Sequence, residues 1–185
     1  LLAGAMVSCS TEDIAPSTQN DKVAVQFTGG ISVNTRAAGV AWADGDKIGI
    51  FMTEAGKTLS ADVIKEGVDN VCYQSNGSIA FSPVSGGKTV FFPIDGDVDF
   101  YSYYPQTTVN DYKVALDVTD QTKQETIDFM YAKTEGCNKA TPQVDLKFFH
   151  KLSNLILDVQ PGNGLTQEDL KKMTVTVKGQ NTKAT

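Results

Sequence analysis

The chain has 185 residues, a formal net charge of −6, 41% hydrophobic residues and 21% charged residues. This composition is that of a folded globular protein with room for one complete domain and part of a second. The acidic balance argues against a nucleic-acid partner, because phosphate-binding surfaces need clustered Lys and Arg. After the first ten residues every apolar run is too short for a transmembrane helix.

The first nine residues form a short apolar run that ends in Ser8 and Cys9, and this pattern is typical of the end of a signal peptide. A small residue directly before Cys resembles a bacterial lipobox, in which the Cys thiol is acylated, for example with palmitate, and anchors the protein to a membrane. The polar residues after Cys9 predict a solvated tether, so residues 1–21 are interpreted as a signal remnant and tether. The acidic stretch 10–13 resembles an export signal to the outer cell surface, which indicates a surface-exposed lipoprotein of the outer membrane.

Beyond residue 21, apolar and polar residues alternate with a period of two, and Gly, Asn, Asp and Pro punctuate the pattern. This pattern predicts short antiparallel strands. The expected strands are residues 23–33, 47–52, 70–74, 78–81, 89–92, 98–104, 112–118, 126–133, 143–150, 154–159 and 173–178. One short helix is expected after Thr166, whose hydroxyl can cap its first turn. The regular spacing of short strands predicts an all-β fold, either a β-sandwich or a barrel.

A break in the strand pattern at residues 135–142 is the expected domain boundary. The strands before it suffice for one β-sandwich, and those after it do not. We therefore expect an N-terminal β-sandwich domain over residues 22–135 and the start of a second β-domain over residues 136–185.

The first expected strand has one apolar face, which is built for burial. This face consists of Val23, Val25, Phe27, Ile31 and Val33. Gly29 and Gly30 interrupt the side chains without changing the phase of the alternation. Burying the five apolar side chains would contribute roughly 7–15 kcal/mol, which rivals the net stability of about 5–15 kcal/mol of a whole domain. Removal of this strand would leave an apolar groove with unpaired backbone edges that another strand could fill.

Arg36 is the only arginine of the chain, and it follows the first expected strand directly. Its neighbours are small or polar, as expected of an exposed and cleavable loop. An arginine-specific protease would cut between Arg36 and Ala37 and would find no second target. Residue counts alone favour the interpretation of Arg36 as a solvated loop charge, whereas its position directly after the first expected strand favours a cleavage site.

Residues for catalysis or metal binding are scarce. With His150 as the only histidine, a serine triad or a His-rich metal site has almost nothing to be built from, and this residue is interpreted as a hydrogen-bonded side chain at a strand end. Residues 95–99 have the opening spacing of a calcium loop, but Phe100 stands where the loop needs Gly and Gln106 where it needs Glu, so a turn with solvated acids is expected. Cys72 and Cys137 are interpreted as small apolar residues, and whether they pair stays open. We expect no enzyme activity, no cofactor and no metal.

Four segments occur in an order that resembles the fimbrillin family of type V pilins. They are residues 41–50, following Thr35, Arg36 and Ala37, and residues 98–105, 127–133 and 146–153. Together with the lipobox they cover nearly the whole chain. The resemblance implies a lipoprotein precursor with two transthyretin-like β-sandwich domains, which is exported to the outer surface and forms a fimbria, or pilus.

The resemblance also implies a maturation route for these positions. Cys9 would carry the lipid, the cut would fall after Arg36, and residues 23–33 would be the removable strand. Donor-strand exchange would then join the subunits, because the vacated groove accepts an extended strand from a neighbour. The implied partners are other pilin subunits, the membrane, an arginine-specific protease, and host or bacterial surface ligands in cell adhesion.

An alternative from another class is a surface lipoprotein that does not polymerise and binds glycans. Tyr101 and Tyr103 share one face of their expected strand, and stacked aromatic rings can hold sugars. Burial of both faces of this strand is the competing interpretation, and the resemblance favours it.

Overall fold

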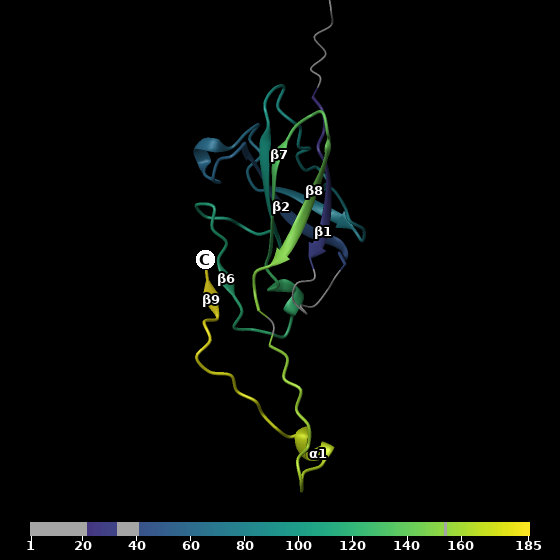
Figure 1. The fold of residues 1–185 in the computed structure, drawn as a ribbon, viewed down its shortest axis with the longest axis vertical. Coiled ribbons are helices and arrows are strands. Elements are labelled where there is room, and N and C mark those ends of the chain that lie inside the picture. Colours follow the sequence, from purple (N-terminus) through teal and green to yellow (C-terminus); the bar gives the residue numbers. More distant parts are fainter. Residues whose placement is uncertain (1–21, 33–40, 154) are drawn as a thin grey trace, which may run out of the picture.

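The computed structural model describes residues 22–32, 41–153 and 155–185, and seven of its strands form one closed barrel (Figure 1). The strands follow one another around the barrel in the order β1-β4-β3-β2-β5-β7-β8. Their bounds are β1 Gln26–Ser32, β2 Asp44–Glu54, β3 Val71–Asn76, β4 Ala80–Pro83, β5 Val98–Tyr104, β7 Met130–Cys137 and β8 Gln143–His150. The predicted all-β class is confirmed, and the sheet closes on itself.

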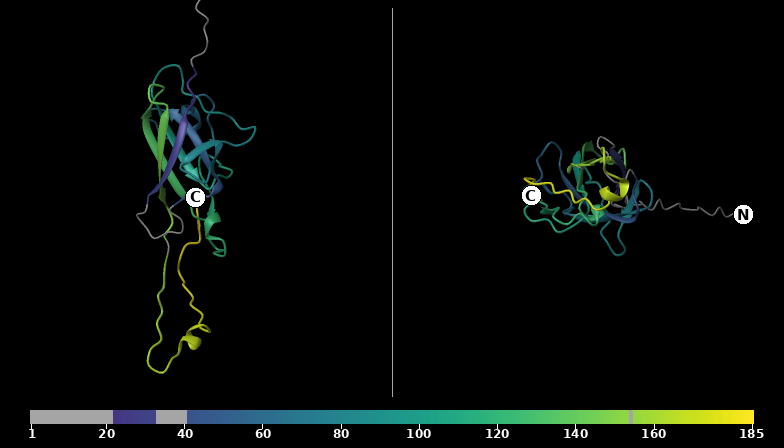
Figure 2. Two further views of the ribbon diagram at one scale, coloured as in Figure 1. Left: turned by 90° about the vertical axis from the view of Figure 1, so that its right-hand side faces the viewer. Right: turned by 90° about the horizontal axis from the view of Figure 1, so that it is seen from below.

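The pairing of β1 with β8 is parallel, whereas the other neighbouring strands of the barrel are antiparallel. Figure 2 shows β1, in purple, beside the green β8. Parallel neighbours need a long connection between them, and here nearly the whole barrel lies between the two strands in sequence. The strand nearest the amino end therefore closes the sheet that the later strands build.

Short elements complete the fold outside the barrel. A small sheet joins β6 Leu116–Asp117 to β9 Lys183–Ala184, and η1 Ala61–Val63 and η2 Gln124–Thr126 are single 3₁₀ turns. The helix α1 Gln167–Leu170 begins after Thr166, whose hydroxyl accepts the N–H of Asp169, so the predicted cap is confirmed. Among the described residues, no helix has the length and apolar character needed to cross a membrane.

The core fills the barrel because every second side chain of a strand points inward. The strand β8 follows this rule strictly, with Val144, Leu146 and Phe148 buried and Asp145 and Lys147 exposed. The neighbouring strands add further inward side chains: Ile48, Ile50 and Met52 from β2, Tyr73 from β3, Phe81 from β4, and Val98 and Phe100 from β5.

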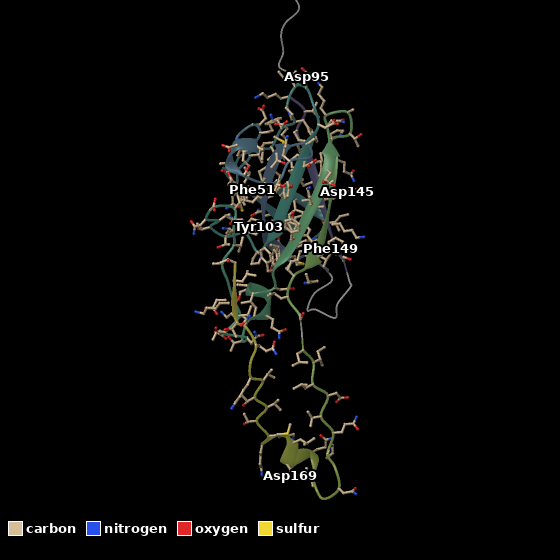
Figure 3. All side chains as sticks on the ribbon, turned by 60° about the vertical axis from the view of Figure 1, so that its left-hand side comes forward. Phe51, Asp95, Tyr103, Asp145, Phe149 and Asp169 are labelled. Atoms are coloured by element: carbon tan, nitrogen blue, oxygen red, sulfur yellow. The ribbon has the colours of Figure 1, made fainter. Side chains whose placement is uncertain are left out.

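The strand β5 is buried on both faces. Phe100 points into the barrel, whereas Tyr101 and Tyr103 point outward and pack with Phe51 of β2 in a second cluster. Figure 3 labels Phe51 and Tyr103 on this outer face. The chain over residues 109–118 lies against the cluster through Val109, Tyr112 and Val114, so we call this range the strap. Two-sided burial explains why five of the seven residues of β5 are apolar or aromatic.

Several expected strands are shorter or missing in the described chain. Residues 89–92 contribute one isolated bridge, between Ala24 and Phe91, although Val90 and Phe92 are buried. The expected strand 112–118 is reduced to β6, because most of the strap covers the outer cluster instead of joining a sheet. The ranges 155–159 and 173–178 have no strand, and their large apolar side chains are exposed.

The domain boundary expected between residues 135 and 136 falls inside β7, which runs on to Cys137. The next strand, β8, pairs with both β7 and β1 and thereby completes the barrel. A boundary at this point therefore does not fit the barrel, which includes residues on both sides of it. The chain leaves the barrel after His150, and we call residues 151–185 the C-terminal arm (Figure 1).

A buried carboxylate explains the break in the strand pattern near residue 136. The side chain of Asp99 in β5 is 1% exposed, and its two oxygens accept the backbone N–H groups of Gly56 and Gly136, each at 2.9 Å. Gly136 adopts a positive φ of 67° where the register between β5 and β7 shifts. The break is therefore a bulge of a continuous strand that Asp99 holds in place.

We expect Asp99→Ala to lower the free energy of unfolding by about 2–4 kcal/mol, because two backbone N–H groups lose a charged acceptor. Urea denaturation followed by circular dichroism measures this loss. The matched control is Asp97→Ala, since Asp97 is exposed and accepts a hydrogen bond from the side chain of Asn138. This control should stay within about 0.5–1 kcal/mol of the wild-type chain. Equal losses for the two variants would contradict the role of Asp99.

Candidate functional site: the β1 groove

The strand β1 is held by backbone hydrogen bonds along both of its edges. Its parallel ladder with β8 extends over seven residue pairs, from Gln26 with Gln143 to Ser32 with Phe149. Its antiparallel ladder with β4 has two residue pairs, and the N–H of Gly29 adds a hydrogen bond of 2.7 Å to the carbonyl of Ile79. The two edges are therefore unequal in length.

The chain just before β1 docks on a different segment. The N–H of Val25 donates to the carbonyl of Val90, and the N–H of Phe92 donates to the carbonyl of Val23, both at 2.9 Å. Residues 90–92 thus continue the edge that β4 begins. We call the channel between β8 on one side and β4 with residues 90–92 on the other the β1 groove.

The apolar face predicted for the first strand points into the barrel. Val25 and Phe27 are 6% and 2% exposed, and Val23 and Ile31 are partly buried against the same core. The ring of Phe27 makes edge contacts with Tyr73 and Phe100, with centroid distances of 5.2 and 5.1 Å. Phe27 therefore reaches the side chains of two strands that do not pair with β1.

Gly29 occupies an inward position of β1 at which a side chain has no room. A Cβ atom built there would lie 2.7 Å from Cε2 of Phe81 and 3.2 Å from Cε2 of Phe148. The adjacent Gly30 points outward, and a Cβ atom built there would meet nothing within 4 Å. Of these two glycines, only Gly29 is required for space.

Trp42 lies beneath Gly29 and binds its backbone. The indole N–H donates to the carbonyl of Gly29 at 2.7 Å, and the side chain is 6% exposed. The indole ring makes edge contacts with Phe81 and Phe148, at centroid distances of 5.0 and 5.1 Å. We call Trp42, Phe81 and Phe148 the aromatic floor of the β1 groove.

The groove has a cavity along its β4 edge, where the ladder with β1 is short. An open cavity of about 320 Å³ lies between β1 and β4, and its lining includes Gln26, Phe27, Tyr73 and Pro83. The ladder between β1 and β4 has only two pairs, so backbone groups and side chains do not fill this edge. The groove therefore has a continuous edge along β8 and an incomplete edge along β4.

The structure brings four of the predicted strand residues together and leaves the other predicted sites untested. Val23, Val25, Phe27 and Ile31 line the inner side of the β1 groove. Cys9, Val33, Arg36 and Ala37 lie outside the described residues. Sequence reasoning did not assign the roles of Gly29 and Trp42. Two signals were present, namely a glycine in phase with an apolar face and the only tryptophan of the chain.

The residues that the sequence offered for catalysis or sugar binding form hydrogen bonds within the fold. Nδ1 of His150 lies 2.8 Å from a carboxylate oxygen of Asp128 at the end of β8, as expected for a hydrogen-bonded strand end. The hydroxyls of Tyr101 and Tyr103 donate to the carbonyls of Lys57 and Thr107, each at 2.7 Å. These two rings are 7% and 4% exposed, so neither offers an open face to a sugar. Within the described ranges, His, Cys, Asp and Glu form no group of three that could hold a metal.

The two described cysteines are free thiols. Burial, together with the nearby carboxylates of Asp99 and Asp97, raises the pKa of Cys137 to about 11. Burial also raises the pKa of Cys72, although the charge of Lys47 opposes this shift. Both thiols therefore stay protonated at neutral pH and are poor nucleophiles.

Comparison with known proteins finds similarity to proteins described as fimbrial or cell-adhesion proteins. The profile described as fimbrillin-like matches residues 35–185, and the chain belongs to the fimbrillin-like family. A relative from Bacteroides uniformis named "Putative fimbrium subunit Fim1C" is 36% identical over 197 residues, which cover 100% of this chain and 62% of the relative.

Solved structures agree with this assignment. A crystal structure of a "putative cell adhesion protein" from Bacteroides uniformis is 36% identical, with a TM-score of 0.56 over 70% of this chain and 49% of that chain. A second crystal structure with the same description, from Bacteroides ovatus, is 27% identical, with a TM-score of 0.52 over 70% of this chain and 53% of that chain. The chain thus spans about half to two thirds of these relatives.

We expect Gly29→Ala to lower the free energy of unfolding of the intact chain by about 1–3 kcal/mol, because the added methyl group overpacks the aromatic floor. Gly30→Ala is the matched control, since its methyl group meets open space and relieves the entropic cost of glycine in a strand. This control should be neutral or more stable by about 0.5–1 kcal/mol. Thermal and urea denaturation measure both variants, and similar effects of the two substitutions would count against a steric role for Gly29.

The raised pKa of Cys137 predicts slow alkylation. A thiol with a pKa of about 11 is only about 0.1% thiolate at pH 8, because each unit of pH below the pKa lowers the thiolate fraction tenfold. Iodoacetamide at pH 8 should therefore modify Cys137 in the folded chain far more slowly than in urea, and the rate should still rise as the pH approaches 10. Peptide mass spectrometry measures the rate, and equal rates in the folded and unfolded chains would refute the prediction.

Proposed function

We propose that this chain is a structural or adhesive subunit of a pilus, made as a precursor and assembled by donor-strand exchange. The observation that carries the proposal is the position of β1, which closes the barrel between β4 and β8. In the sequence, β1 connects to the rest of the barrel through residues 33–40, which contain the only arginine of the chain. One cut after Arg36 would separate the closing strand from the other six strands.

Loss of β1 would create a strong binding site for another strand. The edge of β8 would lose its partners along seven residue pairs, and core residues including Tyr73, Phe81 and Phe100 would lose their cover. Burial of Val25 and Phe27 contributes about 1.5–3 kcal/mol each, and a donor strand with similar side chains would recover this contribution. A strand that enters the groove would satisfy backbone and side chains together by β-augmentation.

The unequal edges of the groove support a stepwise replacement of β1. The open cavity along β4 borders Val25, Gln26 and Phe27, and the ladder between β1 and β4 has only two residue pairs. An incoming strand would first pair with β4 at this edge, while the longer ladder with β8 still holds β1. Displacement would then proceed along β8, one residue pair after another.

The cellular setting follows from the same proposal. Cys9 would be acylated and would hold the precursor at the outer membrane, with the barrel exposed at the cell surface. An arginine-specific protease would cut between Arg36 and Ala37, and the partners would be other pilin subunits and surface ligands. The description of two relatives as cell-adhesion proteins and of one as a fimbrium subunit supports this setting.

We further propose that the C-terminal arm belongs to a second β-domain and that the barrel is the transthyretin-like first domain. In the arm, exposed apolar side chains alternate with polar ones over residues 173–177, as they do in a strand that lacks its neighbours. Leu155, Leu157, Val175 and Val177 are all more than half exposed. These residues would form part of the core of the second domain.

We expect an arginine-specific protease to cut the folded chain once, into fragments 1–36 and 37–185, because Arg36 is the only arginine. Arg36→Lys keeps the charge and should remain uncut, which makes it the matched control. After the cut, fragment 1–36 should stay bound, since backbone ladders hold β1 on both sides. Mass spectrometry identifies the fragments, and native size-exclusion chromatography shows whether they elute together.

The exchange step is tested with a fluorescent peptide of residues 22–36. We expect the cut chain to take up this peptide, whereas the uncut Arg36→Lys chain should exclude it, because a covalent β1 stays at high effective concentration. Uptake is read from fluorescence anisotropy. Equal uptake by the two chains, or protection of Arg36 from the protease in the folded chain, would refute cleavage as the switch.

A further inference from the structure

The alternation of apolar residues does not define the register of a strand in the β1 groove, whereas the aromatic floor does. Alternation decides which face of a strand points inward, but a shift by two residues leaves that face unchanged. In the β1 groove, such a shift would bring Phe27 or Ile31 to the position of Gly29. Apolar pattern alone therefore does not define the register of a strand that enters the groove.

The contacts of Gly29 do define it. A Cβ atom at this position would approach Cε2 of Phe81 to 2.7 Å and Cε2 of Phe148 to 3.2 Å, so a larger side chain has no space there. Both rings are buried, at 6% and 0% exposure, and both make edge contacts with the indole of Trp42. Trp42 therefore packs against the rings of Phe81 and Phe148, and these rings cannot move away from an added side chain without disturbing the core.

Trp42 adds a polar contact to this steric one. Its indole N–H donates to the carbonyl of Gly29 at 2.7 Å, in a buried setting where the N–H has no access to water. Loss of this acceptor would leave a buried donor unsatisfied, which costs more than the bond itself contributes. Because every register supplies a backbone carbonyl at this point, the indole N–H helps to hold a donor strand, and the steric contacts at Gly29 select its register.

We propose that the aromatic floor selects the register and the sequence of the donor strand, and that Phe81 and Phe148 are its specificity-determining residues. The inference rests on the proposed strand exchange and names the chemistry of the partner. The donor is an extended segment of a second subunit, parallel to β8, with a glycine over Phe81 and Phe148. Large apolar residues stand four and two positions before this glycine and two positions after it, as Val25, Phe27 and Ile31 do in β1.

The test uses the wild-type chain cut after Arg36 and a set of fluorescent peptides of residues 22–36. The unsubstituted peptide should bind, and the Gly29→Ala and Gly29→Val peptides should bind progressively more weakly, with roughly tenfold or greater loss for valine. The matched control is the Gly30→Ala and Gly30→Val series, because Gly30 faces open space. Anisotropy measures binding, and the emission of Trp42, the only tryptophan, reports whether the indole is covered.

A second peptide tests register separately from size. It combines Phe27→Gly with Gly29→Phe, which preserves both the composition and the apolar face of the peptide. We expect this swapped peptide to bind at least as weakly as the Gly29→Val peptide. In a cut chain that carries Phe81→Leu, the loss caused by Gly29→Ala should shrink, because the smaller side chain makes room for the methyl group.

The outcomes separate the two proposals. Equal binding of the Gly29 series, the Gly30 series and the swapped peptide would overturn selection by the aromatic floor and leave strand exchange standing. Failure of the unsubstituted peptide to enter the cut chain would overturn strand exchange and this inference together. The Gly29 and swapped-peptide comparisons need only the wild-type barrel, so they do not depend on whether the Phe81→Leu chain folds.

Discussion

The pairing of one short strand with both β8 and β4 is the constraint on which the barrel depends. Among the described strands, only β1 pairs with both β8 and β4. Without β1 the remaining strands would form an open sheet. The same strand places Phe27 against Tyr73 and Phe100 in the core. Closure of the hydrogen-bond network and packing of the interior thus depend on the same seven residues, so the strand cannot be lost without a replacement.

The rest of the barrel has its own source of stability. The strands β2, β3, β5 and β7 are joined by antiparallel ladders that do not involve β1. On the outer face, Phe51, Tyr101 and Tyr103 pack beneath the strap, far from the β1 groove in the ladder order. Stability is therefore divided between an inner core that β1 completes and an outer cluster that it does not touch. This division is suited to the proposed exchange, in which one strand is replaced and the others stay.

Local alternation predicted burial well and hydrogen-bond partners less well. It found β5 and β8 with their observed bounds, because both strands have neighbours along their whole length. It also predicted a strand over residues 89–92, where Val90 and Phe92 are indeed buried but pair with the chain before β1 by isolated bonds. The Gly-containing break near residue 136 indicated a domain boundary, whereas the structure has a bulge there that Asp99 stabilises from β5. A glycine with positive φ has the same local signature in both settings.

The sequence by itself determined which side chains of the first strand face inward, because the backbone of a strand alternates its side chains regardless of context. It also determined that a single arginine follows this strand. Only the tertiary structure decided that β1 runs parallel to β8, that the sheet closes, and that Gly29 lies over Phe81, Phe148 and Trp42. The physical reason is that these contacts join residues far apart in the chain, and steric exclusion at Gly29 depends on rings that other strands bring to that point.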